Sequence, residues 1–114
     1  MSVIDVGAWD GYYSFEAKRR GAARVLATDH FSWIGSGWGK KASFDLAKQL
    51  LAPEIEERII DVPHISVEAV GVFDLMVFAG VFYHLRHPFY ILERLAPVCH
   101  RVIAVETQLD AVRT

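Results

Sequence analysis

The feature that most constrains the fold is the stretch from Val3 to Tyr13, where a short apolar run leads into a glycine-bearing turn and then into a helical pattern. The apolar run is typical of a buried strand. Gly7 and Gly11 allow the backbone to turn sharply and to approach a ligand closely, and Asp10 is a natural N-cap for the following helix. Strand, tight turn and helix in this order predict the opening unit of a nucleotide-binding α/β sheet.

The rest of the chain continues the alternation of strands and helices. Gly21 follows a basic last helical turn, which is typical of a helix C-terminus, and residues 73–79 form a continuous apolar run, as in a parallel sheet covered on both faces. Further strands are predicted at 24–29, 57–60, 73–79 and 101–106, helices at 10–20, 42–51 and 88–95, a helical turn near 66–70, and a glycine- and aromatic-rich loop at 30–41. In helix 42–51 an apolar stripe is expected from Phe44, Leu46, Ala47, Leu50 and Leu51.

This order predicts an α/β fold with an open, mostly parallel five-stranded sheet, flanked by helices that make right-handed crossovers. The 114 residues allow one domain, 1–114, and 53% hydrophobic residues suffice for a core. Because the first strand begins at residue 3 and the last ends near Thr107, we expect a truncated version of such a domain that lacks the last strands.

Composition narrows the partners and the compartment. The net charge of −2 does not indicate a nucleic-acid binder, and a single cysteine, Cys99, excludes a disulfide framework and is expected as a small buried or loop residue. The sequence shows neither a basic segment followed by an apolar leader nor an apolar run long enough for a membrane span. We therefore expect a cytoplasmic protein without a membrane partner; the oligomeric state is left open.

Two acids suggest the kind of ligand. Asp5 lies on the first strand, where a buried carboxylate needs hydrogen-bond donors. Asp29 closes the second strand about 20 residues after the turn, the position of a ribose-binding carboxylate. The dinucleotide fingerprint is incomplete, because Trp9 and Ser14 stand where glycines are required, and Asp10 would repel a diphosphate at the helix N-terminus. A ligand without phosphates, S-adenosylmethionine, fits better than NAD.

At these residues the chain resembles the S-adenosylmethionine-dependent methyltransferases with the Rossmann-like fold. Val3 to Gly11 resembles their first motif, Asp29 the second, Asp61 the third and Phe73 to Leu85 the fourth. Residues 80–88, Gly-Val-Phe-Tyr-His-Leu-Arg-His-Pro, are similar to the subgroup of the wobble-uridine tRNA carboxymethyltransferase and its relatives. The resemblance covers nearly the whole chain.

The resemblance implies a role for each matching position. Gly7 and Ala8 would approach the methionine part of the cofactor, and Asp29 would hold the ribose. His30 and Phe31 would lie along the adenine, and Asp61 and Val62 would meet its edge. Ala79 and Tyr83 would lie near the transferring group, so the cofactor-binding set is Asp5, Gly7, Ala8, Gly11, Asp29, His30, Phe31, Asp61, Val62, Ala79 and Tyr83.

Tyr83 and His84 are the candidate catalytic residues. Histidine titrates near neutrality and could take a proton from an acceptor, while an equally good interpretation makes His84 a structural loop residue. Methyl transfer needs alignment more than base catalysis. His84 and His87 have an H-x-x-H spacing, but no third ligand is evident, so no metal is expected.

The loop 30–41 holds Trp33 and Trp38, contains glycines that would give it mobility, and ends in Lys40 and Lys41. A lid over the adenine or a cap on the sheet edge is favoured over base stacking as in single-strand binders. The favoured function is methyl transfer to an unidentified nucleophile, a small molecule or the wobble uridine of a tRNA. The alternatives are a non-catalytic or truncated cofactor-binding module and an NAD-dependent oxidoreductase.

Overall fold

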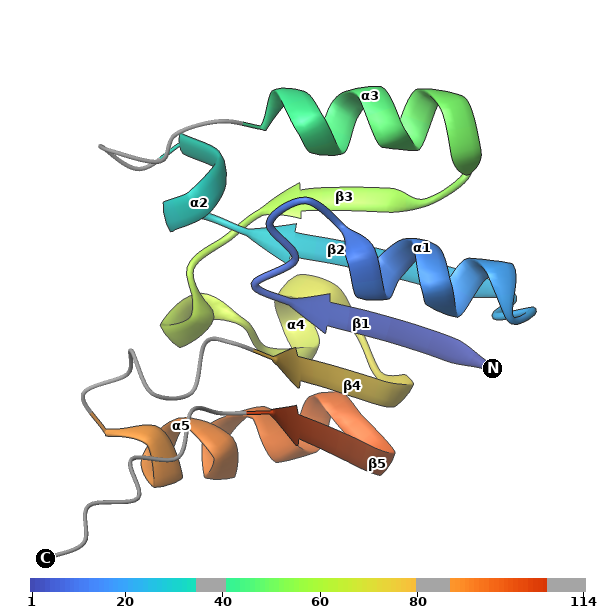
Figure 1. Ribbon diagram of the computed structural model, residues 1–114. Helices are drawn as coiled ribbons and strands as arrows, with labels where there is room; N and C mark the ends of the chain where they lie inside the picture. The colour runs from blue at the N-terminus through green and yellow to red at the C-terminus, as the bar shows by residue number, and fades with distance from the viewer. Residues whose placement is uncertain (35–40, 80–86, 107–114) are drawn as a thin grey trace, which may run out of the picture.

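The computed structural model describes residues 1–34, 41–79 and 87–106, which form a five-stranded sheet with helices on both faces. The strand order is β3-β2-β1-β4-β5 and every neighbouring pair is parallel. The arrowheads in Figure 1 accordingly point the same way, so the carboxyl ends of all five strands lie at one edge of the sheet. The predicted α/β fold with an open parallel sheet is confirmed.

The strand bounds are β1 Ser2–Val6, β2 Arg24–Asp29, β3 Glu56–Ile59, β4 Phe73–Ala79 and β5 Cys99–Glu106. The helices are α1 Tyr12–Arg19, α2 Phe31–Ile34, α3 Ala42–Leu51, α4 Val67–Val70 and α5 Pro88–Leu95, with 3₁₀ turns η1 Val62–His64 and η3 Ala96–Val98. Three predictions are wrong in detail: β3 lies one residue earlier, β5 begins two residues earlier, and the predicted loop at 30–41 opens with α2.

The start of α1 also differs from the prediction. Asp10 is not the N-cap: the cap is Gly11, in the left-handed region at φ 89°, without a side-chain hydrogen bond. The end of α1 is as predicted, because Gly21 at φ 99° donates its N–H to Lys18 while Ala22 donates to Ala17. This pair of bonds is a Schellman motif.

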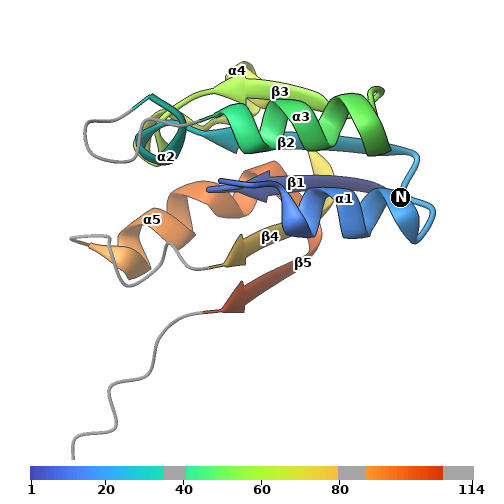
Figure 2. The ribbon, with the colours of Figure 1, turned by 45° about the horizontal axis from the view of Figure 1, so that its top comes forward.

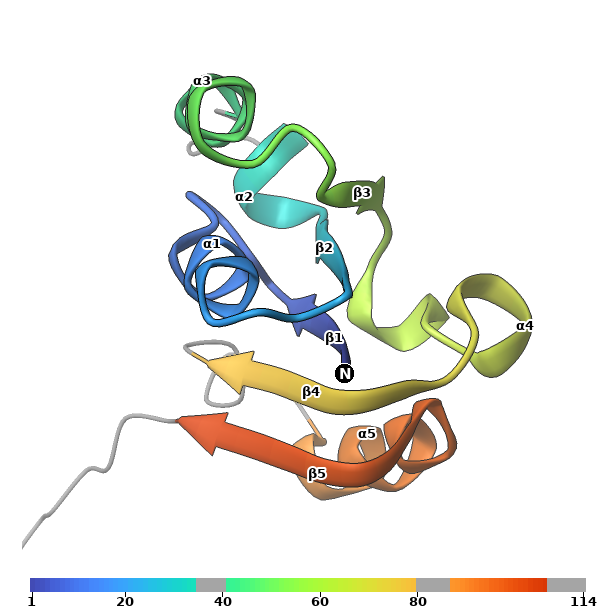
Figure 3. The same cartoon turned by 90° about the vertical axis from the view of Figure 1, so that its right-hand side faces the viewer.

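Two apolar layers hold the helices against the sheet. Ile4, Val6, Met76 and Phe78 pack with Ile91 and other residues of α4, α5 and η3 on one face. Val3, Val25 and Ala27 pack on the other face with α1, Trp33 and Phe44. Figure 3 shows this division, with α1 and α3 on one side of the sheet and α4 and α5 on the other.

Helix α3 lies beside α1, over the edge of the sheet that ends in β3 (Figures 1 and 2). The expected apolar stripe of α3 does not form a core face: Phe44 is buried, while Leu46, Leu50 and Leu51 are exposed. The reason is the position of α3 above an edge strand whose residues are themselves exposed, so that only the first turn of the helix reaches the core. Within the described ranges, no helix has the length and apolar character needed to cross a bilayer.

Candidate functional site

The bend between β1 and α1 lies at the carboxyl edge of the sheet and takes three left-handed backbone conformations. Gly7 has φ 75°, Trp9 φ 50° and Gly11 φ 89°. The N–H groups of Gly7 and Ala8 both donate to the carbonyl of Thr28, at 2.9 and 2.8 Å. These two hydrogen bonds join the bend to Thr28 in the neighbouring strand β2, directly before Asp29.

The carboxylate of Asp29 lies directly against this bend. Its Oδ2 accepts a hydrogen bond from the Trp9 N–H at 2.8 Å, and its Oδ1 accepts from the N–H groups of His30 at 2.6 Å and Ser32 at 3.1 Å. Only 6% of the residue is exposed. A carboxylate offers about four acceptor positions, so these three bonds leave one for a ligand hydroxyl.

Asp5 lies behind the bend rather than on its surface. The residue is 2% exposed, and one carboxyl oxygen accepts a hydrogen bond from the Ser14 hydroxyl at 2.7 Å. Burial raises the pKa of Asp5 from 3.8 to about 6, the Ser14 hydrogen bond works against this rise, and the nearby Asp29 charge adds to it. The side chain thus connects β1 to the first turn of α1.

His30 and Asp61 lie just after the carboxyl ends of β2 and β3 and contact each other. His30 Nδ1 lies 2.9 Å from Asp61 Oδ1, and both side chains are about half exposed. The second Asp61 oxygen lies 3.9 Å from His64 Nδ1, and Val62 begins the 3₁₀ turn η1. This edge therefore presents an accessible carboxylate beside an imidazole.

Gly11 serves the packing of the bend. A Cβ atom at Gly11 would lie 2.6 Å from the Phe15 ring and 2.7 Å from the Phe44 ring. The rings of Phe15 and Phe44 stack with 5.6 Å between their centroids. Gly11 is thus required by the contact between α1 and α3, whatever the bend binds.

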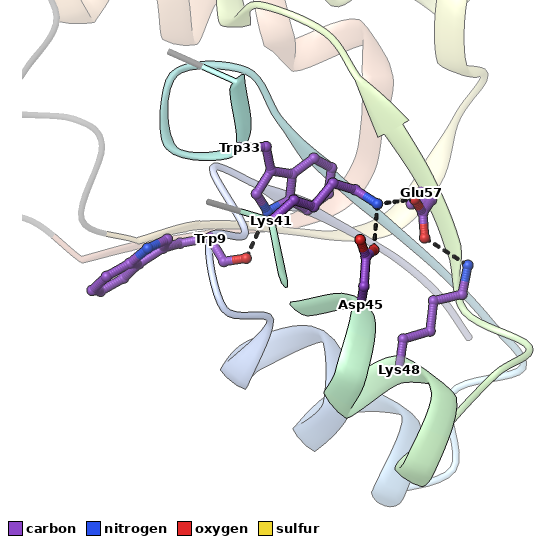
Figure 4. Close-up of polar contacts among 6 residues, drawn as sticks. All are labelled: Trp9, Trp33, Lys41, Asp45, Lys48 and Glu57. Carbon is purple, nitrogen blue, oxygen red and sulfur yellow. Dashed lines mark hydrogen bonds and ion pairs between the residues drawn. The ribbon is translucent and has the colours of Figure 1, made fainter. Parts of the chain in front are cut away.

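The two described tryptophans have different roles. Trp33 is 2% exposed and packs on Phe44 with 4.8 Å between ring centroids, so it is a core residue and the prediction of a mobile lid is wrong for it. Its indole N–H donates to the Trp9 carbonyl at 2.6 Å. Trp9 itself is 45% exposed. Figure 4 shows both side chains at the bend, with Lys41 over Trp33.

Lys41, which the sequence offered as a possible nucleic-acid contact, forms its ion pairs within the protein. Its ammonium group contacts the carboxylates of Asp45 and Glu57 and lies 5.2 Å from the centre of the Trp33 ring. The second carboxylate oxygen of Glu57 is bound by Lys48 at 2.8 Å. The charge of Lys41 is thus compensated within the fold.

The structure brings most predicted site residues to one edge of the sheet: Asp5, Gly7, Ala8, Gly11, Asp29, His30, Asp61 and Val62. The backbones of Phe31, which opens α2, and Ala79, which ends β4, lie at the same edge. Tyr83, His84, Trp38 and Lys40 lie outside the described residues. Among the described residues, no three His, Cys, Asp or Glu side chains are grouped so that they could hold a metal ion.

Sequence reasoning missed three contacts at this edge. Ser14 stands where the dinucleotide fingerprint has a glycine, and its hydroxyl is the donor that the buried Asp5 needs. The pair His30–Asp61 and the bond from Trp33 to Trp9 join residues 24 or more positions apart. No local signal identifies such partners.

No protein-family model matches the sequence, and no curated protein matches it. Solved structures do match the fold. The N-terminal domain of EvdMO1, solved with SAH bound, superposes with a TM-score of 0.69 at 22% identity over 100% of this chain. An S-adenosylmethionine-dependent methyltransferase from Mesorhizobium loti gives 0.65 at 16% identity over 86% of the chain. The [4+2]-cyclase SpnF gives 0.61 at 16% identity over 86%.

At these identities the likeness establishes the fold alone, which this chain shares with a methyltransferase, a domain solved with SAH bound and a cyclase. The chain spans 47% of the EvdMO1 domain, 41% of the Mesorhizobium loti enzyme and 34% of the cyclase. Because one fold serves several chemistries, the reaction has to be argued from the site.

Proposed function

We propose that this chain binds S-adenosylmethionine across the bend between β1 and α1 and forms the cofactor-binding part of a methyltransferase. The observation that carries the proposal is the Asp29 carboxylate, which contacts the bend at the Trp9 N–H in a fold whose neighbours include a domain solved with SAH bound. Ligands of open α/β sheets bind at the carboxyl ends of the strands, where this carboxylate lies.

The residues at this edge fit the parts of the cofactor. Asp29 keeps one acceptor position for a ribose hydroxyl. The exposed Asp61 carboxylate is an acceptor for the exocyclic amine of adenine, with His30 beside it. Gly7 and Ala8 would border the methionine part. A diphosphate fits less well, since Asp10 adds negative charge where phosphates bind, which disfavours an NAD-dependent oxidoreductase.

When bound, the cofactor supplies a methyl group on a sulfonium centre. The chain contributes binding and orientation: Asp29 and Asp61 fix the nucleoside, and the bend fixes the amino-acid part. Alignment of acceptor and methyl group accounts for much of the rate in such a transfer. Tyr83 and His84 follow β4 and are proposed on the acceptor side, His84 as the proton acceptor.

The acceptor is proposed to be a small molecule or the wobble uridine of a tRNA. The second candidate is supported by residues 80–88 alone. Because the chain spans less than half of the length of the structural neighbours named above, a cofactor-binding module without activity of its own is the alternative. A transfer assay with labelled S-adenosylmethionine, small-molecule extracts and total tRNA separates the three cases.

Calorimetric titration tests the binding itself. We expect S-adenosylmethionine and SAH to bind and NAD not to bind. Asp61→Asn should weaken SAH binding several-fold, because one charged acceptor at the adenine edge is lost. Asp29→Asn should weaken it about tenfold or more, because an amide donor then faces the backbone N–H groups of the bend.

Glu54→Gln is the matched control, because Glu54 is exposed and precedes β3, at the opposite edge of the sheet. It should leave the affinity for SAH unchanged. Thermal unfolding of each variant separates lost binding from lost folding. Tight binding of NAD, or equal SAH affinity in wild type and Asp29→Asn, would contradict the proposal.

A further inference from the structure

The peptide groups on either side of Trp9 are each held by a side chain from another element. The Trp9 N–H donates to Asp29 Oδ2 at 2.8 Å, and the Trp9 carbonyl accepts from the Trp33 indole N–H at 2.6 Å. Asp29 ends β2 and Trp33 belongs to α2. The middle of the bend is thus fixed by two hydrogen bonds that do not come from the bend itself.

These bonds hold an unfavourable backbone conformation. Trp9 has φ 50°, and across the ranges 1–34, 41–79 and 87–106 it is the one residue other than glycine with positive φ. A side chain makes the left-handed region costly, whereas glycine occupies it readily. A tryptophan therefore stays there only if surrounding contacts impose the conformation.

Trp33 is itself held rigidly from its other side. Its ring packs against Phe44 and lies under the Lys41 ammonium group. Lys41 is bound in turn by Asp45 of α3 and Glu57 of β3. Figure 4 shows this series of contacts, which runs from the edge strand through Trp33 to the Trp9 carbonyl. The indole N–H has little freedom to leave the carbonyl.

We propose that Trp33 is a positioning residue for cofactor binding, which holds Trp9 in the left-handed conformation so that the bend keeps the shape the cofactor requires. This inference rests on the proposed function. Trp33 is 2% exposed and does not itself need to touch the ligand. Trp33 acts through the Trp9 carbonyl. Asp29 accepts from the Trp9 N–H and, in the proposed function, also binds the ribose.

Four proteins test the inference: wild type, Trp33→Phe, Trp9→Gly and the double variant. Trp33→Phe keeps an aromatic ring in the core and removes the N–H donor. The SAH dissociation constant, measured by calorimetry, should rise about tenfold in Trp33→Phe, as for one lost hydrogen bond to a strained group. In the Trp9→Gly background the same substitution should change it less than about threefold, because glycine needs no help to keep positive φ.

This double-variant comparison distinguishes positioning from packing. If Trp33 contributes only to the core, the substitution weakens SAH binding equally in both backgrounds, and the inference is overturned. It is also overturned if Trp33→Phe binds SAH like wild type. Should Trp33→Phe fail to fold, benzothienylalanine at position 33, which keeps the bicyclic ring and replaces N–H by sulfur, provides the same loss of the donor.

Hydrogen exchange in the ligand-free protein keeps this inference separate from the proposed function. The Trp9 amide should be protected in wild type and exchange several-fold faster in Trp33→Phe, while core amides of β1 and β4 keep their protection. If wild type binds no SAH, the proposed function fails, and the exchange of the Trp9 amide still decides whether Trp33 positions the bend. Unchanged protection in Trp33→Phe overturns it.

Discussion

Replacing the buried Asp5 by asparagine should change how the stability of the protein depends on pH. The carboxyl group is 2% exposed and is hydrogen-bonded by Ser14. Asparagine has nearly the same shape and keeps an oxygen that can accept this bond. The substitution therefore removes the ionisable group with little change in packing.

The magnitude follows from the pKa of Asp5, which burial raises from 3.8 to about 6. A raised pKa means that the folded state binds a proton more tightly than the unfolded state does. Stability from this group is fully present below pH 3.8 and is lost as the pH rises to about 6. Each pKa unit corresponds to about 1.4 kcal/mol, so ionised Asp5 costs the folded state about 3 kcal/mol above pH 6.

Urea unfolding between pH 4 and 8, followed by circular dichroism, measures this effect. The quantity to plot is the free energy of unfolding of wild type minus that of Asp5→Asn, because titrating groups that do not interact with Asp5 cancel in the difference. We expect this difference to fall by about 2–3 kcal/mol between pH 4 and 7 and then to stay constant, because part of the full loss has already occurred at pH 4. In a Ser14→Ala background the fall should be larger and extend to higher pH, since the Ser14 hydrogen bond lowers the pKa of Asp5.

A difference that does not vary with pH, or that rises with pH, would refute the reasoning, because it would show that ionised Asp5 is not penalised by burial. The same variant tests how closely Asp5 approaches the cofactor. Because Asp5 lies behind the bend, Asp5→Asn should weaken SAH binding less than Asp29→Asn does. A larger loss in Asp5→Asn would place the carboxyl group in contact with the ligand.

Three further substitutions have expected effects on stability, each measurable by urea unfolding at pH 7. Gly11→Ala should cost about 2–4 kcal/mol, because the new Cβ atom would lie 2.6 Å from the Phe15 ring at φ 89°; a cost below about 1 kcal/mol would mean that the bend relaxes. Ser66→Ala should cost about 1 kcal/mol, because the Ser66 hydroxyl caps α4 through the Ala69 N–H at 3.1 Å, and an unchanged free energy would show that water replaces the cap. Lys41→Met keeps the apolar stem over Trp33 and removes the ion pairs with α3 and β3, with an expected loss of about 1 kcal/mol; Lys41→Arg, which retains the charge, is its control and should lose less.

The order of the elements could be predicted from the sequence because the signals are local. Apolar runs and helical periodicity gave the extents of β2, α3, β4 and α5 as the structure has them. Gly21 marked the end of α1 through its left-handed conformation. The parallel sheet followed from the alternation of strands and helices, and the parallel strands bring Asp29 and Asp61 to one edge.

What only the tertiary structure decided is which groups meet. The sequence indicated that Asp5 needs a donor, but the packing of α1 on β1 made that donor Ser14. The sequence pattern predicted a loop at Trp33, whereas contacts with Phe44 and the Trp9 carbonyl hold the Trp33 side chain in the core. The sequence pattern also predicted an apolar stripe on α3, of which only Phe44 is buried, because the helix lies over the edge of the sheet. Hydrogen bonds between distant residues, and burial between layers, depend on three-dimensional distances that local patterns do not contain.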